Sequence, residues 1–193
     1  VKFTRSIQSY KAVLTNRNFI LIALVFMVGG AGRGEITPVY LPWHLERDLG
    51  IHVAFAVGAL SIIQFGGLAG PIVVGWISDK TSRIGVLRAS LVLSAIATWF
   101  LAWIGADILT MVVTLLIYGA FTHSRGTLTQ ALIADSVNSD EQAAAFSLYF
   151  FLGFFSVPFW ALMTGYLMDT AGFGVAFSVM GVSYLVALIV MMF

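Results

Sequence analysis

The sequence predicts an all-α membrane protein with six transmembrane helices. Apolar residues make up 60% of the 193 residues and charged residues only 10%, and the mean hydropathy is +0.97. A soluble domain carries about 25% charged residues, so this chain has too few polar side chains to cover a surface in water. Its apolar residues also fall into six stretches, each long enough for the roughly 20-residue helix that crosses a bilayer.

The predicted spans follow a basic, polar lead-in at residues 1–16, which we expect at the membrane surface. The spans cover residues 17–46, 52–77, 84–105, 108–134, 142–168 and 173–193. The connections at residues 105–106 and 171–172 are very short, so we expect the helices that they join to be antiparallel neighbours. Ser139 and Gln142 match a capping box that opens the fifth span.

Cations near the span ends predict the orientation of the chain. Seven of them fall on one side: Lys2, Arg5, Lys11, Arg17, Lys80, Arg83 and Arg88. Only Arg47 lies near a span end on the other side. Lysine and arginine accumulate in cytoplasmic loops, so we expect a multi-pass protein of the plasma or inner membrane with both ends of this chain in the cytoplasm.

Both ends of the chain predict a piece of a longer protein. The sequence begins at Val1 rather than at methionine, and it stops at Phe193 within an apolar run. We therefore expect a missing half of the same protein to be one partner, beside the lipid bilayer and a small solute.

The turn between the second and third spans reads GWISDKTSR at residues 75–83. A glycine closes one helix, Asp79 follows four residues later, and Lys80 and Arg83 flank the turn. This turn resembles the G-x-x-x-D-(R/K)-x-G-(R/K) loop of the major facilitator superfamily, although Ser82 stands where that family usually has glycine. The lead-in ending in NRNF and the stretch YLPWHLERDLGI extend the resemblance, which is to the C-terminal six-helix half of such a transporter.

An offset of 90 residues relates the two halves of the chain, because Gly75 and Asp79 recur as Gly165 and Asp169. Three spans per unit place the units in opposite orientations, so we expect an inverted 3+3 repeat, half of a major facilitator fold. The resemblance implies that the first helix of each unit lines the central cavity. Spans one and four are then the cavity helices here.

Polar residues inside these two spans are the candidate site. A charged side chain at the bilayer centre costs roughly 2.5–3.5 kcal/mol on insertion scales, so it is usually paired or functional. At about 100° per residue, one stripe of span four carries the predicted solute-binding residues Arg125, Tyr118, Thr122 and Thr129. Arg33 in span one and Gln64 in span two complete the predicted solute site, and Glu35 and His123 are the predicted proton-coupling groups.

Structural roles compete with these assignments. Glu35 and Arg33 lie about 200° apart on their helix, so Glu35 could instead neutralise Arg125 or His123 across the bundle. His123 could be a satisfied interior histidine, and Gln64 could bond to a neighbouring helix.

The resemblance also implies a gating role for the turn residues Gly75, Asp79, Lys80 and Arg83. In the family, the acid of this turn joins a charge network at the cytoplasmic face that holds the outward-open state. Here Asp79 can pair with Arg83. The alternative is that the motif only marks topology.

These observations predict a secondary active transporter that works by alternating access, is ion-coupled and carries an organic anion. An alternative is a multidrug-type efflux transporter, and another is a non-transporting receptor or scaffold on the same fold. The sequence contains no P-loop for ATP and no G-x-S-x-G turn to serve a nucleophilic serine. We therefore expect neither an enzyme nor a cofactor, metal or nucleic-acid partner.

Overall fold

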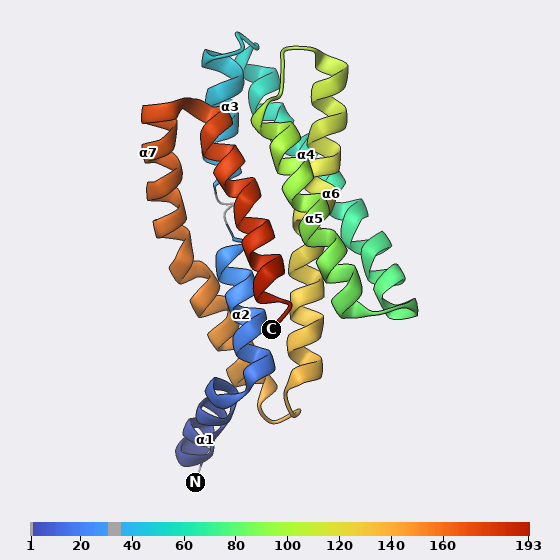
Figure 1. Ribbon diagram of the computed structural model, residues 1–193, viewed down its shortest axis with the longest axis vertical. Helices are drawn as coiled ribbons and strands as arrows, with labels where there is room; N and C mark the ends of the chain where they lie inside the picture. The colour runs from blue at the N-terminus through green and yellow to red at the C-terminus, as the bar shows by residue number, and fades with distance from the viewer. Residues whose placement is uncertain (1, 31–35) are drawn as a thin grey trace.

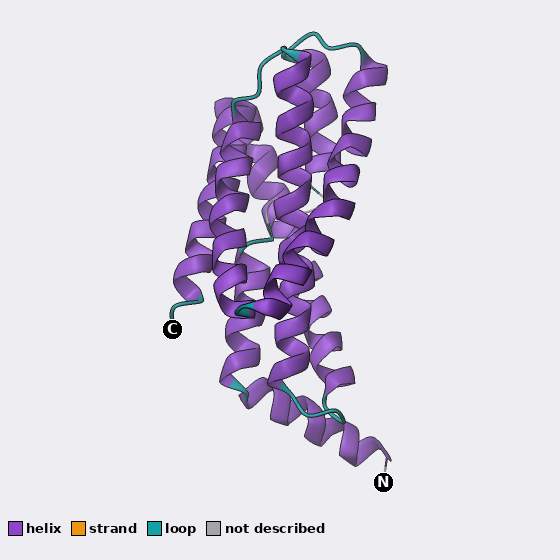
Figure 2. Ribbon diagram, turned by 90° about the vertical axis from the view of Figure 1, so that its right-hand side faces the viewer, coloured by secondary structure: helices purple, strands orange, loops and turns teal. Residues whose placement is uncertain are grey.

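The computed structural model describes residues 2–30 and 36–193, and within them it consists of seven α-helices joined by short loops (Figures 1 and 2). The helices are α1 (Lys2–Thr15), α2 (Arg17–Val28), α3 (Thr37–Arg47), α4 (Val53–Lys80), α5 (Arg83–Ala102), α6 (Ile108–Ser136) and α7 (Gln142–Val190). The long helices run side by side along the long axis of the molecule (Figure 1).

Helix α7 is two antiparallel segments rather than one rod. Gly172 has φ 84° and ψ 172° inside it, a backbone conformation that glycine adopts without the steric penalty of a Cβ atom. Figure 1 shows the first segment rising to one end of the bundle and the second returning beside it. The reversal lies at the short connection that the sequence predicts at residues 171–172.

The region of the first predicted span, residues 17–46, is interrupted. Helix α2 ends at Val28 and α3 begins at Thr37. Gly29 and Gly30 follow α2, and glycine is among the poorest helix formers. Pro38 stands in the first turn of α3, where its missing N–H costs no intrahelical hydrogen bond. The predicted residues Arg33 and Glu35 lie outside the described residues.

Length and hydropathy identify the membrane helices. In the described part of the chain, α4, α5, α6 and α7 are long and apolar enough to cross a membrane, and a fifth candidate is the bent pair α1–α2. Helices α1 and α2 meet at 76°. Asn16 fixes this elbow, since its side chain accepts hydrogen bonds from the backbone N–H groups of Asn18 and Phe19 and donates to the carbonyl of Ser136 at 2.7 Å.

Helices α4 and α6 pack backbone against backbone. A Cβ atom added at Gly66 would meet the carbonyl of Leu116, one at Gly70 would meet that of Ala120, and one at Gly119 would meet that of Ile63. Small residues allow membrane helices to approach closely in this way. The rest of the bundle forms by packing α5 on α6 and α7, and α2 on α7.

The two ends of the bundle differ. The N-terminus, the α4–α5 turn and the α6–α7 connection lie at one end, while the α3–α4 and α5–α6 connections and the reversal of α7 lie at the other (Figure 1). We call the first the basic end because Arg17, Arg83 and Arg88 lie there. Arg17 donates to the carbonyl of Phe193 at 2.5 Å, and Arg88 donates to that of Met191 at 3.0 Å, so the last residues also belong to this end.

The predicted capping box of the fifth span is wrong. Helix α7 does begin at Gln142, but no side chain caps it there. Instead the carboxylate of Glu141 accepts hydrogen bonds from the backbone and side-chain nitrogens of Asn138, both at 3.1 Å. The acid next to the helix start thus orders the preceding loop.

Candidate functional site

The predicted polar stripe of α6 lies on one face of the helix and is buried within the bundle. Tyr118, Thr122, Arg125 and Thr129 are each at most 6% exposed. Their partners come from three other parts of the chain. Tyr118 Oη lies 2.7 Å from Thr37 Oγ1 of α3. The other contacts reach α2 and both segments of α7.

Thr129 and Thr122 use their hydroxyl groups within this interior. Thr129 Oγ1 lies 2.7 Å from Tyr149 Oη of α7, and Thr122 Oγ1 donates to the carbonyl of Tyr118 at 2.6 Å. The stripe therefore joins α6 to α3 and to the first segment of α7 through hydroxyl pairs.

Arg125 is the charged residue of this stripe. Its Nη1 donates a hydrogen bond to the carbonyl of Gly29, the residue that ends α2. The guanidinium carbon lies 5.0 Å from the ring centroid of Tyr184 in the second segment of α7, within the range of a cation–π contact. Arg125 Nε is buried and has no hydrogen-bond partner among the described residues.

A second polar face of α6 is open where the first is buried. His123 and Gln130 are half-buried and Thr127 is exposed. The His123 ring packs over α4, where a Cβ atom on Gly67 would lie 2.9 Å from it. His123 Nδ1 lies 3.0 Å from the carbonyl of Gly119. A carbonyl only accepts, so Nδ1 carries the hydrogen of this bond.

Gln64 shares this open face with His123. It lies on α4 one helical turn before Gly67, and residues three apart are neighbours on a helix surface. Its side chain is exposed. The structure thus brings Gln64 and His123 to one side of the α4–α6 pair, and it directs Tyr118, Thr122, Arg125 and Thr129 to the other side of α6, into the bundle.

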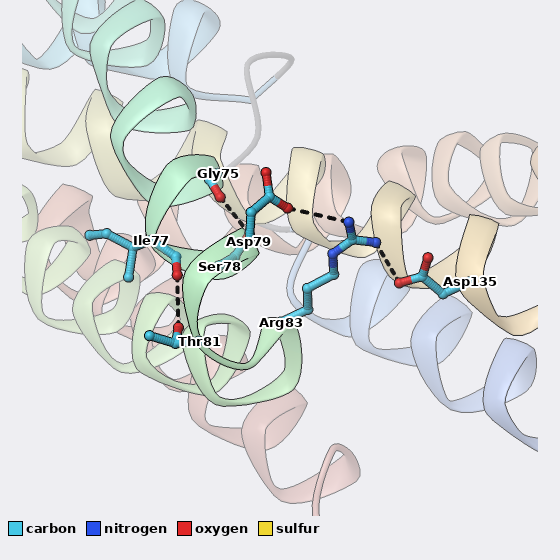
Figure 3. A network of polar contacts seen from close by, with 7 residues as sticks. All are labelled: Gly75, Ile77, Ser78, Asp79, Thr81, Arg83 and Asp135. Carbon is cyan, nitrogen blue, oxygen red and sulfur yellow. Dashed lines mark hydrogen bonds and ion pairs between the residues drawn. The ribbon is translucent and has the colours of Figure 1, made fainter.

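Two of the predicted gating residues, Asp79 and Arg83, form a charged bridge with Asp135 across three helices, drawn in Figure 3. Arg83, the first residue of α5, donates to Asp79 of α4 at 3.3 Å and to Asp135 of α6 at 2.5 Å. Both carboxylates raise the pKa of the Arg83 guanidinium, and the hydrogen bond to Asp135 has the larger effect. Beside this bridge, Lys80 Nζ lies 3.8 Å from the ring centroid of Trp76, and a Cβ atom at Gly75 would meet no atom within 4 Å.

Asp135 was missed in the sequence analysis. It lies 52 residues beyond Arg83, a separation that no local motif spans. The available signal was topological, since the end of span four and the turn after span two fall on the same predicted side of the membrane. Among the described residues, no three histidine, aspartate or glutamate side chains gather into a metal site.

Comparison with known proteins supports the same architecture. None of the curated proteins matches the sequence. A solved structure of the POT family transporter PepTSo matches with a TM-score of 0.79 and 19% sequence identity, over 92% of this chain and 37% of that one. The chain therefore shares the fold of that transporter and spans about 37% of its length.

A family model matches more directly. Residues 18–193 fit the model described as Major Facilitator Superfamily, which is nearly the whole chain from the start of α2 to the last residue. Members of this family are transporters, not enzymes. The chain belongs to the major facilitator superfamily.

Proposed function

We propose that the chain is one six-helix half of a secondary active transporter that moves a small solute by alternating access. In this proposal α2 and α3 form one broken span and α7 contributes two spans. With α4, α5 and α6 the count reaches six, arranged as an inverted 3+3 repeat. The missing half then closes the pathway, in keeping with a chain that covers only 37% of a related transporter.

The observation that carries this proposal is the open polar face of α4 and α6. Gln64, His123, Thr127 and Gln130 keep polar groups exposed or half-buried on the outer side of the α4–α6 pair. Polar groups that face lipid are costly, so such a face normally meets a water-filled cavity or another part of the protein. A solute path between the two halves satisfies that requirement.

We assign roles on this path as follows. His123 carries the coupled proton through Nε2, and Gln64 contacts the solute. Arg33 and Glu35 of predicted span one complete the proposed site. Arg125 lies on the buried side of α6 and not on this face. It stays a proposed anion-binding residue, with an organic anion as solute, because its buried Nε–H donor has no partner among the described residues.

We further propose that the bridge Asp79–Arg83–Asp135 is the cytoplasmic gate. It ties the ends of α4, α5 and α6 together at the basic end, and the open space at Gly75 leaves room for the other half to approach. Single cysteines at Ser82 and at Asp48, at opposite ends of the bundle, should then be labelled from opposite faces of the membrane. Labelling of both from one face would contradict the orientation.

The test of transport uses the full-length protein in vesicles that contain a pH-sensitive dye. A panel of organic acids, neutral sugars and cationic dyes is added under an imposed proton gradient. We expect uptake of an organic acid together with a change of internal pH, and neither signal in empty vesicles or in the same vesicles without a gradient.

Other outcomes separate the alternatives. Export of the cationic dyes would favour the multidrug-type transporter, and solute binding without flux would favour a receptor or scaffold. If no solute on the panel moves or binds, the transporter proposal in this form fails.

A further inference from the structure

The end of α2 lies at mid-height in the bundle, between the basic end and α3 (Figure 1). The last carbonyl groups of a helix have no partner within the helix. Within a membrane no water is at hand to satisfy them, and each unsatisfied group costs several kcal/mol. The break after Val28 is therefore stable only if other parts of the protein supply donors.

Two side chains from two different helices supply these donors. Arg125 of α6 donates Nη1 to the carbonyl of Gly29, and Trp160 of α7 donates Nε1 to the carbonyl of Met27 at 2.9 Å. Among the described residues, the carbonyl of Met27 otherwise receives the backbone N–H of Gly29 and a long contact of 3.4 Å from Gly30 N. A cation at this position is also stabilised by the negative end of the helix dipole.

The absence of a side chain at Gly29 leaves room for this contact. A Cβ atom there would lie 2.7 Å from Arg125 Nη1 and 3.4 Å from the Cβ of Ala187. Any other residue would place a Cβ atom too close to Nη1, so the guanidinium would have to shift. Tyr184 also contacts the guanidinium, with its ring centroid 5.0 Å from the guanidinium carbon.

The far side of the break is tied to the same two helices. Thr37 at the start of α3 bonds to Tyr118 of α6 at 2.7 Å, and Tyr40 donates to the carbonyl of Ala161 of α7 at 3.2 Å. Tyr118 and Arg125 are seven residues apart, which places them two turns apart on one face of α6. The two edges of the break are thus tied to α6 at residues two turns apart and to α7 at the adjacent residues Trp160 and Ala161.

We propose that Arg125 and Trp160 are positioning residues that cap the broken end of α2 and fix where the glycine-rich stretch GGAGRG begins. Neither residue needs to touch the solute for this role. The cap holds the lower edge of the break on α6 and α7, while α3 above it keeps its own ties.

Hydrogen–deuterium exchange on the full-length protein in lipid nanodiscs tests the cap without any solute. In Trp160→Phe and in Arg125→Met, we expect amides from Val25 to Ile36 to exchange about tenfold faster or more, because the loss of a hydrogen bond shifts local opening by that order. Arg125→Lys keeps one charged donor and should restore part of the protection.

The matched control is Trp99→Phe. Trp99 also donates its indole N–H to a backbone carbonyl, that of Ser178, at 3.1 Å, but it lies between α5 and α7 away from the break. This variant should leave exchange at Val25–Ile36 unchanged. If Arg125→Met does not fold, Gly29→Ala with Trp160→Phe tests the same two contacts. Wild-type exchange at the break in Trp160→Phe and in either Arg125→Met or Gly29→Ala would overturn the cap.

A second arm measures transport and rests on the proposed function. A positioning role predicts that Trp160→Phe lowers the maximal rate while the half-saturating concentration of the solute stays the same. A raised half-saturating concentration with wild-type exchange would make Trp160 a solute contact and overturn its positioning role. If wild type moves no solute, the proposed function fails while the exchange result still decides the cap.

Discussion

Arg83 and Arg125 show how differently the same side chain behaves at the two levels of this bundle. Arg83 is partly exposed at the basic end and bridges two carboxylates, Asp79 and Asp135. Arg125 is 2% exposed and is paired with a carbonyl and an aromatic ring instead of an acid. Exposed ion pairs contribute little to stability and weaken in salt, whereas loss of a buried donor leaves its acceptor unsatisfied. The first arrangement suits a contact that must open and close, and the second suits one that must stay.

The largest effect on stability is expected at Arg125. Arg125→Met removes the donor to the carbonyl of Gly29 and leaves that group buried, at a cost of about 1–3 kcal/mol. Arg125→Lys should cost less. Thermal unfolding of the purified full-length protein measures both, and equal unfolding temperatures for wild type and Arg125→Met would remove the contrast with Arg83.

The double change Arg125→Gln with Glu35→Gln sharpens the role of Arg125. If the guanidinium binds an anionic solute, Arg125→Gln should weaken anion binding by about tenfold to a hundredfold while sparing neutral analogues, and the second change should not rescue it. Isothermal titration with the transported solute measures this. Restored anion transport in the double variant would instead favour a structural ion pair with Glu35.

The next effect is expected at the gate and falls on rate rather than stability. Asp79→Asn removes one of the two acids that hold Arg83, so transport should fall about tenfold with expression and solute binding nearly unchanged. Uptake in vesicles, with binding measured in parallel, gives the comparison. A variant that transports at the wild-type rate would reduce the motif to a marker of topology.

The smallest effect is expected at Asp107, an exposed acid at the start of α6. It caps α6 by accepting hydrogen bonds from the side chain and the backbone N–H of Thr110, and these bonds lower the pKa of Asp107. A lowered pKa in the folded state adds stability above the unfolded pKa, and this stability is lost as the pH falls through the folded value. The unfolding temperature of wild type relative to Asp107→Asn should therefore drop slightly between neutral pH and pH 3. A difference that does not change with pH would contradict it.

The long apolar helices could be predicted from the sequence because each is a single hydropathy run with a clear polar or glycine stop. The reversal at Gly172 is the clearest case. The break after Val28 could not be predicted in this way, since the glycines that end α2 are themselves compatible with an apolar run. A hydropathy window averages over these glycines, whereas each glycine by itself weakens the helix at its own position.

The sequence could predict which polar residues share a face of α6, but not which of the faces is buried. Periodicity correctly grouped Tyr118, Arg125 and Thr129 on one face of α6 and His123 on another. It could not tell which face is buried against α2, α3 and α7, because that depends on neighbours far away in the sequence. The contact of Arg83 with Asp135 escaped prediction for the same reason.

The glycine contact between α4 and α6 has a consequence for how this sequence can change in evolution. No side chain stands between the two helices at Gly66, Gly70 and Gly119, so their spacing is set by the backbones alone. The outward face of α4, with Phe65 and Ile72 exposed, can therefore accept almost any apolar residue without moving α6. We expect descendants of this sequence to vary freely on that face and to retain the three glycines, since a single added methyl group would separate the helix that carries Gln64 from the one that carries His123.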